Sequence, residues 1–75
     1  MSGETGYLVI IEGEPGSYSG YSPDLPGCVA AGDSPDEVVQ LMREAIPLHI
    51  RSLREHGEPV PPPRSRAQYV VPEAS

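Results

Sequence analysis

The 75-residue sequence contains no tryptophan, no phenylalanine and only one cysteine, Cys28. A lone cysteine excludes an intramolecular disulfide, and the core has to be built from aliphatic side chains, methionine and some of the four tyrosines. There is neither a long apolar run nor a charged-then-apolar leader, so we expect a cytoplasmic protein without a membrane segment. A chain of this length forms a single domain, residues 1–75, whose ends at residues 1–6 and 72–75 we expect to be loose.

Lysine is also absent, and five arginines stand against eleven acidic residues, which gives a formal charge of −6. Nucleic-acid binding draws most of its non-specific affinity from cationic contacts to phosphates, so we do not expect this chain to bind DNA or RNA directly. An acidic surface suits a basic protein partner instead, because complementary fields speed the encounter. Solubility alone is an equally good explanation of the charge.

The first half of the chain predicts three strands and two turns. Residues 7–12 are rich in β-branched and aromatic side chains and are apolar on both faces, which is typical of an interior strand covered on both sides. The sequence E-P-G-S at residues 14–17 fits a type II turn. Residues 17–22 predict a weaker second strand, and residues 28–31 predict a short third one. Between them, S-P-D-L-P-G at residues 22–27 predicts a rigid extended turn, because each proline restricts itself and its predecessor.

A helix follows, and its start is strongly marked. Ser34 stands at a capping position, Pro35 at the first helical position and Glu37 three residues after the cap, so the two side chains can satisfy free backbone donors reciprocally. Pro47 falls on the solvent side, where it either bends the helix or breaks it, and Gly57 is expected just after the helix end. One buried stripe is predicted by the apolar residues at helical spacing: Val38, Met42, Ala45, Ile46, His49 and Leu53.

The last part of the chain predicts a return toward the sheet. Residues 58–63, E-P-V-P-P-P, favour polyproline II, and residues 68–71 predict a short final strand before Pro72. The element order is then β-β-β-α-β, an α+β fold with one helix on one face of a small, mainly antiparallel sheet. Since a single helix leaves the other face open, we expect the chain to associate with itself as a homodimer or a larger assembly.

Sequence motifs for catalysis or cofactor binding are missing, namely a phosphate-binding loop, a paired-cysteine metal pattern, a nucleophile elbow and a zinc-protease motif. We therefore expect no enzymatic activity, no cofactor and no metal. His49 is expected to be a packed structural residue and Cys28 a small buried one. A small ligand-binding or enzymatic domain that uses His49 or Cys28 is the alternative function. For Asp24, a bond to its own turn backbone and contact with a partner are both open.

Four motifs occur in an order that resembles the HicB-like antitoxin family of bacterial toxin–antitoxin systems. They are an apolar strand ending in an acidic residue (7–12), the P-D-L-P-G turn (23–27), a Gly-x-Ser-x-x-Glu helix start (32–37) and a Gly-x-x-x-Pro exit (57–61). The resemblance spans residues 7–71 and implies a partial ribonuclease-H-like fold that associates with itself and with a toxin. Many members carry a DNA-binding segment after this core. Because the sequence has none, we expect no DNA binding by this chain alone.

The resemblance also implies a function, which is to neutralise a small, basic, mRNA-cleaving toxin of the HicA type by covering its RNA-binding surface. Toxins of that type resemble a double-stranded-RNA-binding fold with an active-site histidine, so an acidic cap would exclude RNA by shape and by charge. The acidic and turn residues Glu12, Glu14, Asp24 and Leu25 are the expected contact surface. The acidic residues lack the ordered carboxylate pattern that holds two magnesium ions, so the fold resemblance does not extend to nuclease activity.

Overall fold

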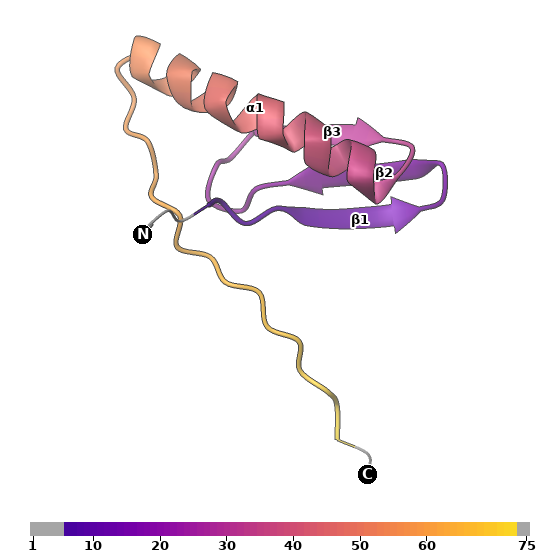
Figure 1. Cartoon of the computed structure of the whole chain (residues 1–75). Coiled ribbons are helices and arrows are strands. Elements are labelled where there is room, and N and C mark those ends of the chain that lie inside the picture. Colours follow the sequence, from indigo (N-terminus) through magenta and orange to yellow (C-terminus); the bar gives the residue numbers. More distant parts are fainter. Residues whose placement is uncertain (1–5, 74–75) are drawn as a thin grey trace, which may run out of the picture.

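The computed structural model describes residues 6–73 and shows a three-stranded sheet with one long helix. The elements are β1 (Ile10–Glu14), β2 (Ser17–Tyr21), β3 (Val29–Gly32) and α1 (Pro35–Glu55). The strands are antiparallel in the order β1-β2-β3, and α1 lies across one face of the sheet (Figure 1). The expected α+β class is therefore confirmed, whereas the likeness to ribonuclease H stays a prediction. The ends expected to be loose lie mostly outside the described residues.

The central strand is β2, so the expectation that the first strand lies in the interior of the sheet was wrong. β1 is an edge strand that pairs with β2 alone, from Ile10 opposite Tyr21 to Glu14 opposite Ser17. The apolar character of both its faces has two separate causes. Val9, just before β1, and Ile11 pack against the core under α1, and residues 8–11 together line a shallow groove at the outer edge of the sheet.

The turn between β2 and β3 is rigid, as its prolines predict, and consists of two successive hydrogen-bonded turns. The Leu25 N–H donates to the Ser22 carbonyl at 3.1 Å, and the Cys28 N–H donates to the Leu25 carbonyl at 3.0 Å. Gly27 adopts a φ of 88°, which the second turn requires after Pro26 and which other residues rarely adopt. The Ser22 N–H donates to the Cys28 carbonyl at 3.3 Å and closes the base of this double turn.

The core lies between the sheet and α1 and contains no large aromatic side chain at its centre. Its fully buried members are Leu25, Cys28, Val38 and Met42, with partly buried apolar residues from all three strands around them. Gly20, in the middle of β2, lets the helix approach closely. A Cβ atom at this position would lie 2.6 Å from a methyl carbon of Val38. The predicted helical stripe is confirmed, because all six of its residues are buried or half-buried.

Both ends of α1 are capped by the residues that the sequence indicates. The Glu37 N–H donates to the Ser34 hydroxyl at 3.2 Å, but the Glu37 carboxylate accepts from the N–H of Asp33 at 2.6 Å, one residue before the expected one. At the other end, the Gly57 N–H donates to the Arg54 carbonyl and the Glu58 N–H to the Leu53 carbonyl, which is a Schellman motif. The helix continues unbroken through Pro47, whose side chain is exposed.

The predicted fourth strand is absent from the described residues. Residues 58–73 have no regular structure, and their last part runs away from the sheet as an extended arm (Figure 1). We call residues 67–73 the C-terminal arm. Its strand-forming residues Tyr69, Val70 and Val71 are 97%, 80% and 85% exposed. A strand needs a hydrogen-bonded neighbour as well as suitable residues, and within residues 6–73 of one copy the arm has none.

Candidate protein-binding surface

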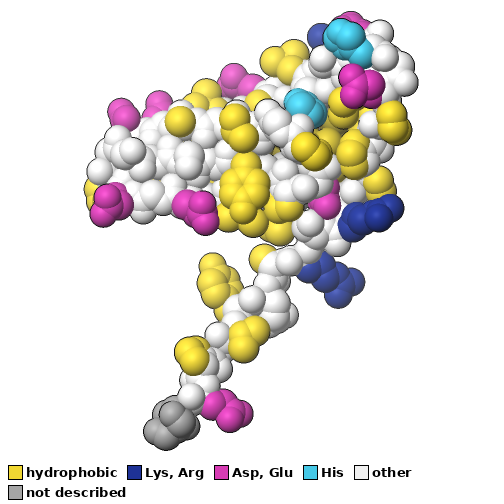
Figure 2. All heavy atoms as spheres, turned by 180° about the vertical axis from the view of Figure 1, so that it is seen from behind, with side chains coloured by type: hydrophobic (Ala, Val, Ile, Leu, Met, Phe, Trp, Pro, Cys, Tyr) yellow, Lys and Arg dark blue, Asp and Glu magenta, His cyan; other side chains and the backbone are white. Residues whose placement is uncertain are grey.

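Carboxylates gather at the end of the molecule where the β1–β2 turn meets the start of α1. Glu12 and Glu14 are exposed in the last part of β1, and Asp33 and Asp36 are exposed just before and inside the first turn of the helix. The Gly16 N–H donates to the Asp33 carbonyl at 3.1 Å, which joins the hairpin turn to the helix start. We call these four residues the acidic end. Figure 2 shows acidic side chains around this end and no arginine among them on that face.

Asp24 lies at the opposite end of the sheet, because the turn that carries it follows Tyr21, which pairs with Ile10 at the start of β1. Its carboxylate accepts three hydrogen bonds from the chain just before the C-terminal arm. One Oδ atom accepts from the N–H groups of Arg64 and Ser65 at 3.0 and 2.9 Å, and the other accepts from the Ser65 hydroxyl at 2.9 Å. The expected bond to its own turn is replaced by a bond to a distant segment.

The pKa of Asp24 is held below its ordinary value, chiefly by the hydrogen bond from the Ser65 N–H. Partial removal from water acts in the opposite direction, while the Arg64 N–H, the Ser65 hydroxyl and the Arg64 charge add to the lowering. Hydrogen bonds to an ionised carboxylate favour its charged form. Asp24 therefore works as an ionised anchor for the end of the chain, in addition to any contact with a partner.

Leu25, the remaining residue of the expected contact surface, is fully buried in the core. Its side chain packs beneath the double turn, and its backbone N–H and C=O groups both belong to that turn. In this structure it determines where Asp24 stands and does not present its side chain at the surface. The four expected residues thus fall into three settings: Glu12 and Glu14 at the acidic end, Asp24 at the other end, and Leu25 inside.

Between the two ends lies the sheet face that α1 does not cover, which the sequence predicted to be open without indicating which residues lie on it. Paired residues of an antiparallel sheet share a face, so the register places Ile10, Tyr21 and Val29 in one row on this face and Glu12, Ser19 and Ala31 in the next. Val29 is 65% exposed and Tyr21 is 40% exposed. The open face therefore runs from an apolar row near Asp24 to carboxylates at the acidic end. The strand register, which the sequence alone does not give, was needed to identify the residues of this face.

The residues considered for catalysis show no arrangement that supports it. Cys28 is a buried free thiol, and burial raises its pKa, which keeps it protonated and weakly nucleophilic. The half-buried His49 ring lies beneath the double turn, where a Cβ atom at Gly27 would be 3.7 Å from its Cε1 atom. Across residues 6–73 no group of three or more His, Cys, Asp or Glu side chains is placed to hold a metal ion. No helix of this part of the chain is both long and apolar enough to cross a membrane.

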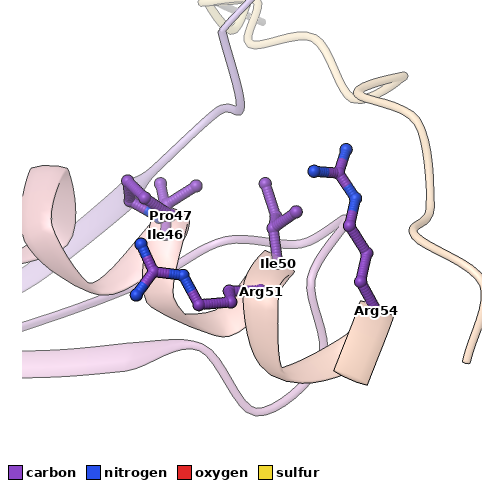
Figure 3. A pocket seen from close by; sticks show the side chains of 5 residues that line it. All are labelled: Ile46, Pro47, Ile50, Arg51 and Arg54. Carbon is purple, nitrogen blue, oxygen red and sulfur yellow. The ribbon is translucent and has the colours of Figure 1, made fainter. Parts of the chain in front are cut away.

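The surface of residues 6–73 includes two shallow grooves that are lined by neither Cys28 nor His49. One, of about 400 Å³, lies on the second half of α1 and is lined by Ile46, Pro47, Ile50, Arg51 and Arg54. Figure 3 shows Ile50 between Pro47 and Arg54, with both guanidinium groups beside the apolar side chains. The other, of about 340 Å³, lies between residues 8–11 and the start of the C-terminal arm. The first groove is locally basic, so it contrasts with the acidic end.

Fold and surface together define a small α+β protein whose exposed features suit binding to another protein. Comparison with known families matches residues 7–74 to the family described as the HicB_like antitoxin of bacterial toxin-antitoxin system. The chain therefore belongs to the HicB-like antitoxin family, as the sequence motifs indicated. The family assignment covers nearly the whole sequence, including the C-terminal arm.

Individual relatives agree with this assignment. The chain is 43% identical over 56 residues to the UPF0150 protein ssr1765 of Synechocystis sp., covering 73% of this chain and 71% of the relative. It is 34% identical over 67 residues to the UPF0150 protein Ta0767 of Thermoplasma acidophilum, covering 89% and 94%. A 14.9 kDa protein of Haemophilus phage HP1 is 36% identical over 64 residues, which are 85% of this chain but only 48% of the phage protein. No solved structure gives a significant match.

Proposed function

We propose that this chain is the antitoxin of a toxin–antitoxin pair and that it neutralises a small, basic, mRNA-cleaving toxin of the HicA type in the bacterial cytoplasm. The family supports the antitoxin role. The observation that carries the choice of partner and surface is the acidic end, where four exposed carboxylates stand together without a neighbouring arginine on the face shown in Figure 2. A basic RNA-binding surface would be attracted to this end, and RNA would be repelled from the complex.

Neutralisation of this kind needs no catalysis by the antitoxin. The acidic end would approach the toxin first, and the open sheet face with Tyr21 and Val29 offers apolar area for the final contact. The same open face supports association of the chain with itself. The Asp24 turn contributes by holding the chain end rather than by a free carboxylate.

The test is binding to the short basic protein encoded next to this chain's gene, followed by an RNA-cleavage assay. We expect the wild-type chain to bind and to block cleavage. The double substitution Glu12→Arg and Glu14→Arg should slow association by about tenfold or more at low salt and weaken the salt dependence of binding, because steering acts on the association rate. Asp24→Ala should act more on dissociation.

Arg51→Glu is the matched control, because it also changes charge but lies in the basic groove on the outer side of α1. It should leave toxin binding unchanged. If Arg51→Glu weakened binding while the Glu12 and Glu14 substitutions did not, the contact surface would lie on the helix and the antitoxin role would stand. Absence of binding to every basic protein encoded beside the gene would contradict the role itself.

A further inference from the structure

The C-terminal arm has the composition of a strand but no strand partner within one copy of the chain. Tyr69, Val70 and Val71 are almost fully exposed, although β-branched and aromatic residues of this kind favour a pleated, half-buried setting. The hydrogen bond found in the described part of the arm is local, from the Gln68 side-chain amide to the Tyr69 carbonyl at 3.2 Å. Apart from the Tyr69 carbonyl, the backbone groups of residues 68–71 are therefore available for pairing.

The base of the arm is held firmly, so its direction is set by the fold. The Tyr7 hydroxyl donates to the Pro61 carbonyl, and Asp24 binds the Arg64 and Ser65 N–H groups. Between these anchors, consecutive prolines at residues 61–63 restrict the backbone. The arm consequently projects from the body (Figure 1), as an element placed to reach another surface.

A receiving edge of matching length exists on the same protein. Residues 8 and 9 lead into β1, and β1 pairs with β2 on one side only, so the outward backbone groups of Ile10 and Ile11 are unpaired within the part of the chain that the structure describes. The groove of about 340 Å³ runs along this edge, with Leu8, Val9, Ile10 and Ile11 on one wall and Ala67, Gln68 and Tyr69 on the other. An exposed apolar edge of this kind accepts an added strand through main-chain hydrogen bonds.

Charge indicates which molecule supplies the strand. Residues 6–63 carry nine acidic residues and three arginines, whereas residues 64–73 carry two arginines, Arg64 and Arg66, and one glutamate. The arm itself carries only Glu73, but its base, with Arg64 and Arg66, is attracted to the acidic body of a second copy and would be repelled by a basic toxin. We propose that residues 68–71 of one copy add as a strand to residues 8–11 of a second copy, and that the exchange is reciprocal about a two-fold axis.

This inference rests on the self-association that is part of the proposed function, and it specifies how the association occurs. The strand missing from each single copy is then supplied by the partner copy. The exchange covers the three most exposed large apolar residues of the chain and removes one unpaired sheet edge from each copy.

The first experiment measures mass in solution by light scattering. The full chain should give about twice its 8.0 kDa mass at micromolar concentration. Val70→Asp should raise the dimer dissociation constant by at least about tenfold, because a charge would enter the paired segment. Leu48→Asp is the matched control, since Leu48 is 58% exposed on α1 and takes no part in the exchange, so its dimer should be unchanged.

The second experiment identifies the contact by disulfide formation between two chains of different tag length. One chain carries Leu8→Cys and the other carries Val70→Cys, while the native Cys28 is buried in both. We expect a disulfide between the two chains, and at least about tenfold less of it when Ala31→Cys, on the outer edge of β3, replaces Leu8→Cys. The wild-type mixture should give none.

Each contrary result overturns a different claim. A monomer overturns both the exchange and the self-association but leaves toxin binding untouched. A dimer that tolerates Val70→Asp and gives no disulfide overturns the exchange alone. If Val70→Cys forms its disulfide with Ala31→Cys and not with Leu8→Cys, the arm pairs with the β3 edge. If a single chain that carries both Leu8→Cys and Val70→Cys forms the disulfide internally, the arm closes on its own sheet. Either of these two outcomes also overturns the proposal.

Discussion

Asp24 joins two segments that lie about 40 residues apart in the sequence. Its carboxylate receives backbone and hydroxyl hydrogen bonds at 2.9 to 3.0 Å, and charge-assisted bonds of this kind are about twice as strong as neutral ones. The residue therefore links the double turn to the base of the C-terminal arm. An aspartate that follows proline in a turn is expected to bond its own backbone, so its real partner could not be inferred from local sequence.

The ionisation of Asp24 makes this link dependent on pH. Because the folded pKa is lower than the ordinary value of 3.8, the link contributes its full stabilisation above that value and loses it as the pH falls through the lower folded pKa. We expect the amides of Arg64 and Ser65 to be rigid at pH 7 and mobile once the pH has fallen below the folded pKa of Asp24, with NMR order parameters falling from about 0.85 to below about 0.6.

The substitution Asp24→Ala should make the same amides mobile at pH 7 as well. Asp36→Ala is a suitable control, because it removes an exposed carboxylate from the helix start and does not touch the base of the arm. If the order parameters stayed high in Asp24→Ala, or in the wild-type chain after the NMR signal of the Asp24 carboxyl group shows its protonation, the prolines and the Tyr7 bond would be sufficient to hold the arm, and the anchoring role of Asp24 would be wrong.

Among the elements, α1 was the one that sequence reasoning described best, because its signals are local. The cap at Ser34, the proline at the first helical position, the apolar spacing and the terminal glycine all lie within or beside the helix. The strands were less well described, since pairing depends on distant residues. Contacts with distant residues decide whether residues 7–12 form an interior or an edge strand, and whether residues 68–71 pair with another strand. A local sequence pattern does not contain this information.

The helix start offers a direct test of these local signals. The Ser34 hydroxyl accepts the N–H of Glu37 at 3.2 Å, so Ser34→Ala removes a cap and should lower the free energy of unfolding by about 1 kcal/mol. Ser52→Ala is the matched control, because Ser52 is exposed inside α1 and alanine is the better helix former, so stability should be unchanged or rise by a few tenths of a kcal/mol.

Urea unfolding followed by circular dichroism measures both variants, and the slope with denaturant should stay constant. Equal midpoints for Ser34→Ala and the wild-type chain would mean that the bond from Asp33 to Glu37 holds the helix start without the hydroxyl. In that case the double substitution Ser34→Ala and Glu37→Ala would lower the free energy of unfolding, although Ser34→Ala alone does not.

At the scale of the whole molecule, the two kinds of charge are unevenly distributed. Figure 2 shows only acidic charged side chains around the acidic end, whereas the other end carries arginines together with acidic residues, among them Glu55 and Glu58. Composition correctly indicated a net acidic protein, but it did not reveal this distribution. The sequence analysis predicted that Glu12 and Asp24 belong to one contact surface. The strand register shows that they lie at opposite ends of the sheet.

The same distribution of charge leads to a prediction about DNA. A formal charge of −6 and an acidic body oppose the approach of a polyanion, and only the basic groove on α1 and the two arginines at the base of the arm offer a local attraction. We therefore expect no retardation of DNA from the promoter of its own gene by this chain alone at micromolar concentration, even at low salt, where electrostatic attraction is strongest.

A gel-shift assay with promoter DNA and with a random duplex of equal length measures this. Retardation of both duplexes that disappears in the Arg64→Ala and Arg66→Ala double variant would reveal non-specific binding by the arm. Retardation of the promoter alone would contradict the prediction, because it would require a base-reading surface on a chain whose open sheet face carries carboxylates at one end and an apolar row at the other.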